Sequence, residues 1–180
     1  AKPYLLCEDE SVIGTMFYVM DCVEGRIYWG PLLPDCTPLE RGAIYDAMNE
    51  TLARLHMLDY ETLGLADFGK PGADIARQIT RWTKQDLASQ TETIVEMDRL
   101  MEWLPKHLPP EERTCIVHGD YRLDNMFFGN GHGPFRLAVF DWQSPNRGWG
   151  AYDLAYFISG TMEPAARRAS ERDALRRYHA

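Results

Sequence analysis

Residues 117–142 read VHGDYRLDNMFFGNGHGPFRLAVFDW and combine short apolar runs with a few regularly placed polar residues. The apolar runs at 125–128 and 136–140 predict two short strands, and 115–117 predicts a buried strand just before them. A Gly- and Asn-containing turn separates the first two runs, as in a hairpin. The polar residues that fall in and around these strands are His118, Asp120, Asn125 and Asp141.

The spacing of these polar residues resembles the catalytic loop of protein kinases. That loop reads H-R-D, four further residues and Asn, and a later Asp-Phe-Gly supplies a second metal ligand. Here the loop runs HGDYRLDN, and Asp141 ends the following strand within DWQ. Phosphoryl transfer needs a carboxylate at the incoming hydroxyl and hard oxygen ligands for Mg²⁺. The pattern therefore predicts Asp120 as the catalytic base and Asn125 and Asp141 as the metal ligands.

Two neighbouring residues have predicted roles beside Asp120. Arg122 occupies the position where kinases often place a lysine that contacts the transferred phosphate, and a guanidinium can do the same. A surface ion pair is the other interpretation of Arg122. His118 is predicted to shape the loop, because a single buried histidine more often serves structure than catalysis.

The motif HGDxxxxN, followed by an apolar strand and Asp-Trp, resembles the aminoglycoside phosphotransferase and choline kinase superfamily. These proteins are small-molecule kinases with a protein-kinase-like fold. The chain is also similar to the phosphotransferase-like domains related to the kinase-like part of acyl-CoA dehydrogenase family members 10 and 11. The stretches that carry this likeness are YVMDCVEG, LARLHMLD, RQITRWTKQ and VHGDYRLDNMFF, and they extend over nearly the whole chain.

The resemblance implies an α+β fold made mostly of the helical C-terminal lobe, with a small β-hairpin catalytic element. Residues 1–24 correspond to the last strand or strands of the N-terminal lobe and the hinge, and 25–180 to the catalytic lobe. The phosphate-covering loop, the strand lysine and its helix glutamate of the family have no counterpart before Tyr18, and Lys2 is too close to the hinge to replace that lysine. We therefore expect an upper lobe that is largely missing, a lobe incomplete at both ends, and little phosphotransfer by the 180 residues alone.

The resemblance also implies residues that hold the nucleotide and support the loop. The adenine hinge would use the carbonyl of Asp21 and the N–H of Val23, with Met20 as the gate beside the pocket. Asp153, in GAYDLAYF, matches an aspartate that braces the catalytic loop from the following helix. Taken alone, Asp153 is equally typical of a helix N-cap.

Elsewhere the chain reads mainly as helix and loop. Residues 15–23 predict a buried strand. Thr37-Pro38-Leu39-Glu40 predicts a capped helix start, and the apolar spacing that follows predicts a helix to about residue 58. A long helix is predicted after residue 74, with Ile75, Ile79 and Trp82 on one face. Further helices are predicted over 92–104, over 152–158 and from 163 onward, with loops at 59–74 and 144–150. Trp82, Trp103 and Trp142 are expected in the core.

Composition excludes several classes of protein. The 180 residues are 45% hydrophobic and carry a formal net charge of −8, which argues against disorder and against general nucleic-acid binding. No apolar run reaches membrane-span length, so no membrane partner is expected. Cys22 and Cys115 lie in apolar stretches and are predicted to be buried, reduced thiols, which favours a cytoplasmic protein.

The sequence therefore predicts an ATP- and Mg²⁺-dependent phosphotransferase that acts on the hydroxyl of a small molecule. A catalytically silent nucleotide-binding module is the main alternative. A metal-dependent phosphohydrolase built on His118, Asp120, Asp141 and His132 is a weaker one, because the chain lacks further His/Asp pairs for a two-metal site. The acceptor is left open among an aminoglycoside, a choline-like alcohol and a hydroxy acid or related metabolite.

Overall fold

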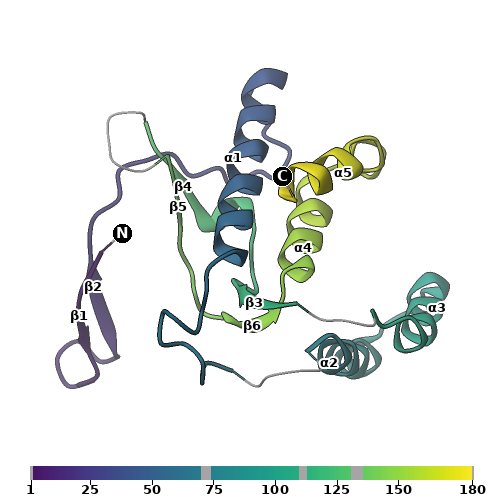
Figure 1. Cartoon of the computed structure of the whole chain (residues 1–180), viewed down its shortest axis with the longest axis horizontal. Helices are drawn as coiled ribbons and strands as arrows, with labels where there is room; N and C mark the ends of the chain where they lie inside the picture. Colours follow the sequence, from purple (N-terminus) through teal and green to yellow (C-terminus); the bar gives the residue numbers. More distant parts are fainter. Residues whose placement is uncertain (1, 70–73, 110–112, 131–135, 180) are drawn as a thin grey trace.

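The computed structural model describes residues 2–69, 74–109, 113–130 and 136–179 as a mixed assembly of helices and short strands (Figure 1). In chain order the elements are β1 (Pro3–Cys7), β2 (Phe17–Met20), α1 (Pro38–His56), α2 (Asp74–Ser89), α3 (Val95–Trp103), η1 (Leu104–Lys106), β3 (Thr114–Val117), η2 (Leu123–Asn125), β4 (Met126–Phe128), β5 (Leu137–Val139), β6 (Asn146–Trp149), α4 (Ala151–Thr161) and α5 (Pro164–Tyr178). The predicted α+β fold is thus confirmed, with helix predominant.

The first two strands form an antiparallel hairpin that stands to one side of α1 (Figure 1). The prediction of a buried strand over 15–23 is wrong in its burial, because Tyr18 is 62% exposed and Val19 is 45% exposed. Two strands alone cannot cover both of their faces, so apolar side chains of the hairpin remain in contact with solvent. Cys22, just past β2, is exposed, so its predicted burial is wrong, whereas Cys115 is buried as predicted.

Helix α1 is the centre of the core and begins where the sequence predicts. The Thr37 side chain accepts a hydrogen bond from the Glu40 backbone N–H, and the Glu40 side chain accepts one from the Thr37 backbone. This reciprocal capping box satisfies donors that a helix start otherwise leaves unpaired. The buried apolar residues around α1 are Leu33, Ile44, Met48, Leu52, Tyr121, Leu123, Met126, Phe128, Leu154, Phe157 and Ile158.

Two further two-stranded sheets flank the loop of residues 118–125, which is the predicted catalytic loop. The β4–β5 hairpin pairs Met126 with Val139, as the apolar runs predict. In contrast, β6 lies in the stretch predicted to be a loop, and it pairs antiparallel with β3 from Thr114↔Trp149 to Val117↔Asn146. The sequence of β6, NRGW, lacks a strand pattern, so its extended form depends on the partner strand.

The remaining helices lie on either side of this core. Helices α4 and α5 pack against α1, whereas α2 and α3 extend away from it (Figure 1). Trp82 on α2 and Trp103 on α3 are 45% and 52% exposed, and Trp142 is 43% exposed, so the prediction that they are core residues is wrong. Within the described residues, no helix combines the length and apolar character needed to cross a bilayer.

Candidate active site

The catalytic loop starts at the end of β3 and returns into β4. Its last turn, η2, ends at Asn125, whose carbonyl accepts a hydrogen bond of 3.1 Å from the Phe140 backbone N–H. This bond extends the β4–β5 pairing by one step and places Asn125 opposite Phe140. Asp141 follows Phe140 directly, so it lies one position beyond the partner of Asn125. The structure therefore brings the two predicted metal ligands to the same end of the hairpin.

Asn125 also fixes the orientation of Asp120. The Asn125 Nδ2 donates to the Asp120 backbone carbonyl at 2.9 Å and to the Asp120 Oδ2 at 3.0 Å. Asn125 is 7% exposed, and Asp120 is half-buried. Oδ2 accepts from Asn125, whereas Oδ1 has no hydrogen-bond partner among the described residues and is the Asp120 oxygen left to meet a ligand.

The donor set around Asn125 and Asp141 fits Mg²⁺. Within the described residues, both hydrogen bonds of the Asn125 side chain use its nitrogen, which leaves the carbonyl oxygen as a hard ligand. Asp141 adopts φ = +60°, a left-handed backbone conformation that is uncommon for residues other than Gly but that Asn and Asp adopt more often than the rest. One amide oxygen and one carboxylate, completed by phosphate oxygens and water, are the ligands that Mg²⁺ takes at phosphoryl-transfer sites.

A larger protein-only metal site is not seen in the parts of the chain that the structure describes. No group of three or more His, Cys, Asp or Glu side chains gathers there in a geometry suited to a metal ion. His132, the fourth member of the predicted hydrolase set, lies outside the described residues. The described residues thus give the hydrolase interpretation no support.

Gly119 explains why the loop reads HGD rather than the kinase HRD. Its φ is +85°, and a Cβ at this position would lie 2.3 Å from the Ser144 carbonyl oxygen. Both the left-handed backbone and the close approach of another main chain exclude a side chain here.

Asp153 contacts the loop from the first turn of α4. Its Oδ2 accepts the His118 backbone N–H at 2.6 Å, and its Oδ1 accepts the Gly119 N–H at 2.8 Å. The carboxylate is fully buried, and such a group is tolerated only when it is well hydrogen-bonded. The helix N-cap is Gly150 instead, so Asp153 has the contacts that a bracing role requires and not those of a cap.

His118 is buried and makes contacts from both ring nitrogens. Its Nδ1 lies 3.3 Å from the Asp120 backbone N–H, which can only donate, and its Nε2 lies 3.0 Å from the Phe140 carbonyl, which can only accept. The ring therefore carries its proton on Nε2. It links Asp120 to the strand that precedes Asp141, and it packs edge-on against Trp142 at 4.6 Å.

Two residues that were not predicted for the site are connected to Asp153 by hydrogen bonds, one directly and one through the other. His56, at the end of α1, places its Nε2 3.3 Å from the Asp153 Oδ2. The Tyr178 hydroxyl, from α5, lies 2.6 Å from the His56 Nδ1. Separations of 97 and 122 residues hide these contacts from motif spacing. The one available signal was the histidine within LARLHMLD, a stretch that carries the family resemblance.

Arg122 lies beside the loop in an ion pair. Its guanidinium binds both Asp124 carboxylate oxygens and also interacts with the Tyr156 hydroxyl. The bond to Asp124 raises the pKa of Arg122 and lowers the pKa of the Asp124 carboxyl. The structure thus shows the ion pair named as the alternative. The phosphate contact stays a prediction, and it requires the guanidinium to turn from Asp124 or to share it.

The predicted hinge residues lie at the end of β2, which is Met20, and directly after it. The carboxylate of Asp21 accepts hydrogen bonds from the Lys2 backbone N–H and the Tyr4 hydroxyl, which fix it to β1, and the Tyr4 bond lowers the pKa of Asp21. Met20 and Val23 are half-buried nearby. The adenine contacts assigned to these residues stay predictions.

The segment after the hinge, at residues 25–26, connects the β1–β2 hairpin to the strand that follows the catalytic loop. Arg26 and Phe128 exchange backbone hydrogen bonds of 2.8 and 2.9 Å, and a Cβ on Gly25 would lie 2.8 Å from the Phe128 carbonyl. The hinge segment therefore lies directly on β4, the strand that follows Asn125.

A fold with a kinase-like catalytic loop, a β-hairpin beyond it and a helical lobe around it defines the protein-kinase-like phosphotransferases. The model of the phosphotransferase enzyme family matches residues 1–179, and the chain belongs to this family. A solved aminoglycoside phosphotransferase-like protein from Ralstonia eutropha is 51% identical, with a TM-score of 0.78 over 91% of this chain and 50% of that one. A type VIII aminoglycoside-3′-phosphotransferase, 20% identical, shares the fold with a TM-score of 0.62 over 98% of this chain and 64% of that one.

Curated relatives carry similar sequences within much longer proteins. Acyl-CoA dehydrogenase family member 10 of Mus musculus is 48% identical over 84% of this chain and 14% of its own length. Acyl-CoA dehydrogenase family member 11 of Homo sapiens is 44% identical over 87% of this chain and 20% of its own length. The chain thus spans a seventh to a fifth of these relatives.

Proposed function

We propose that the chain is the catalytic lobe of a kinase that transfers the γ-phosphoryl group of ATP to the hydroxyl of a small molecule. The observation that carries this proposal is the pairing of 125 with 140, which sets Asp120, Asn125 and Asp141 around one end of a hairpin. Membership of the phosphotransferase family supports the same reaction class.

The residues suggest how the proton and the phosphoryl group move. The acceptor hydroxyl approaches Asp120 Oδ1, since Oδ2 is held by Asn125. The hydroxyl oxygen bonds to the γ-phosphorus as the bond from that phosphorus to the β-bridging oxygen breaks, and the hydroxyl proton passes to Asp120. ADP leaves with the bridging oxygen, and positioning of this kind is the main source of rate in phosphoryl transfer.

Asn125 and Asp141 would hold the Mg²⁺, which when bound neutralises charge on the phosphates. The buried position of Asn125 and its bond to Asp120 keep this ligand in one rotamer, so little ordering is needed when the nucleotide arrives. Met20, Asp21 and Val23 would hold adenine at the hinge, which the Arg26–Phe128 backbone pair keeps in register with β4.

The relatives suggest an acceptor class. They are named as acyl-CoA dehydrogenase family members. We therefore propose a hydroxy acid or a related metabolite as the acceptor in preference to an aminoglycoside.

The complete native protein that contains this chain provides the test. ADP release should require ATP, Mg²⁺ and a hydroxy acid or its derivative together, and removal of Mg²⁺ with EDTA should abolish it. Phosphate release from simple esters without ATP would instead indicate a hydrolase. Stabilisation by ATP without turnover on any hydroxyl compound would indicate the silent module.

A further inference from the structure

The catalytic loop is tied to the last helix through a buried chain of hydrogen bonds. The chain runs from the Tyr178 hydroxyl to His56, then to Asp153, and from Asp153 to the backbone N–H groups of His118 and Gly119. We propose that Tyr178 is a positioning residue, which acts through His56 to hold Asp153, and with it the loop that carries Asp120, in one geometry. This inference rests on the proposed function of Asp120.

The direction of each hydrogen bond follows from chemistry. Asp153 can only accept, because its oxygens also take the two backbone N–H groups at 2.6 and 2.8 Å. His56 therefore donates from Nε2, and in the neutral imidazole its Nδ1 then accepts from the Tyr178 hydroxyl. The tyrosine thus selects the one neutral tautomer of His56 that can bond to Asp153.

The surroundings keep this arrangement dry and tight. The side chain of His56 is 4% exposed and that of Asp153 is fully buried. Burial raises the pKa of Tyr178 to about 12, which keeps its hydroxyl protonated as a donor. Gly150 lies against both partners, since a Cβ there would be 2.5 Å from the His56 Nδ1 and 2.8 Å from the Tyr178 hydroxyl oxygen.

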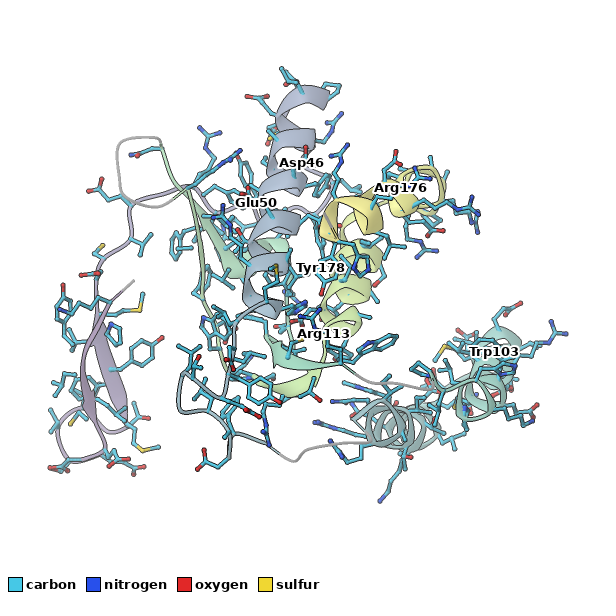
Figure 2. All side chains as sticks on the ribbon, in the orientation of Figure 1. Asp46, Glu50, Trp103, Arg113, Arg176 and Tyr178 are labelled. Atoms are coloured by element: carbon cyan, nitrogen blue, oxygen red, sulfur yellow. The ribbon has the colours of Figure 1, made fainter. Side chains whose placement is uncertain are left out.

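This chain of hydrogen bonds connects helices that are far apart in the sequence. Tyr178 lies at the end of α5 that faces α1 (Figure 2), and Asp153 lies at the start of α4. From Gly119, which Asp153 holds, only one peptide bond leads to Asp120. Movement of α5 against α1 would therefore change the position of the proposed base through this chain of hydrogen bonds.

The test compares Tyr178→Phe with Arg176→Ala in the complete native protein. Tyr178→Phe removes one hydroxyl and leaves the ring packed on His56, whereas Arg176 lies on the same helix with its side chain 77% exposed. We expect kcat to fall about tenfold in Tyr178→Phe, the scale of one buried hydrogen bond. The KM for ATP should stay unchanged, and Arg176→Ala should match the wild type. An unchanged kcat in Tyr178→Phe overturns the proposal.

A double-mutant cycle with His56→Leu tests the route. If Tyr178 acts through His56, then Tyr178→Phe should cost nothing further in the His56→Leu background. Equal costs in both backgrounds would mean that Tyr178 acts by another route and would overturn the proposal. Gly150→Ala, which pushes the two partners apart, should reproduce the kcat loss of Tyr178→Phe.

A spectroscopic measurement separates this inference from the proposed function. In protein labelled with ¹⁵N in histidine and glycine, Tyr178→Phe should change the ring-nitrogen shifts of His56 and the amide shift of Gly119. These shifts are observable even if no acceptor is ever phosphorylated, in which case the proposed function fails and the coupling still stands. Unchanged His56 and Gly119 signals would overturn the coupling whatever the activity.

Discussion

At the scale of single residues, the site depends on groups that are held rather than free. Asp153 is a fully buried carboxylate that is hydrogen-bonded to two backbone amides and one imidazole. The amide nitrogen of Asn125 donates to Asp120. Each bond is worth about 1 kcal/mol net, but leaving its buried partner unpaired costs more. The loop therefore has one low-energy conformation, which is what a base that must meet a hydroxyl at short range needs.

Gly119 offers a direct test of that conformation. We expect Gly119→Ala to destabilise the chain by at least about 1–2 kcal/mol, the usual cost of a left-handed φ for alanine. The Ser144 carbonyl at 2.3 Å from the new Cβ adds to this cost. Urea unfolding followed by circular dichroism measures the change.

Gly160→Ala is the matched control, because a Cβ there meets nothing within 4 Å and Gly160 lies in helix α4. A Gly119→Ala variant as stable as the wild type would contradict the observed loop conformation.

At the scale of elements, local sequence signals determine where α1 begins, and tertiary contacts stabilise the rest of the helix. Its start is fixed by the Thr37–Glu40 capping box, and its body is held by core contacts such as the bond from the Tyr121 hydroxyl to the Met48 carbonyl at 2.7 Å. Burial of that hydroxyl raises the pKa of Tyr121, so it remains a donor throughout the physiological range. The helix is thus a rigid support for both the loop and His56.

Opposite changes at two positions of α1 test this account. Thr37→Ala should lower the free energy of unfolding by about 1 kcal/mol, because it removes the side-chain cap. Gly42→Ala should raise it by about 0.5–1 kcal/mol, because a Cβ there meets nothing within 4 Å and alanine favours helix. Thermal or urea unfolding measures both. Shifts of the same sign in the two variants would contradict the assigned helix start.

The elements that the sequence predicts are those with strong local signals. The capped helix α1, the strand β3 and the β4–β5 hairpin were all predictable from caps and apolar runs. Strand β6 was not, because NRGW becomes extended only when it pairs with β3. The burial of tryptophans was not predictable either, since exposure of Trp82 depends on what α2 packs against.

For the site, spacing predicted the residues within one loop and hairpin. Asp120, Asn125 and Asp141 are brought together by pairing that the motif itself encodes. His56 and Tyr178 were missed because their contacts join three helices across long sequence separations. No local sequence pattern indicates which helix ends contact one another in the folded protein.

At the scale of the whole molecule, the β1–β2 hairpin leaves apolar surface uncovered. Leu6 and Tyr18 face each other across the two strands and are 64% and 62% exposed. Contiguous apolar surface of this kind is typical of an interface.

Replacing both residues by threonine, a good strand former, should remove part of that surface with little effect on folding. We expect weaker fluorescence of the dye ANS with the 180-residue chain carrying Leu6→Thr and Tyr18→Thr, and an unchanged thermal midpoint. Unaltered dye fluorescence would show that the hairpin is not the exposed apolar surface. Ser11→Thr, in the exposed loop between the strands, is the control.

In the proposed reaction, Asp120 receives the proton of the acceptor hydroxyl. The most direct measurement is the kcat of ATP-dependent acceptor phosphorylation by Asp120→Asn in the complete native protein, beside Asp173→Asn, an exposed carboxylate on α5. Loss of a general base predicts a fall of about 10²–10⁴-fold in kcat for Asp120→Asn, with ATP affinity retained. Asp173→Asn should match the wild type. A kcat for Asp120→Asn within a few fold of the wild type would contradict the account.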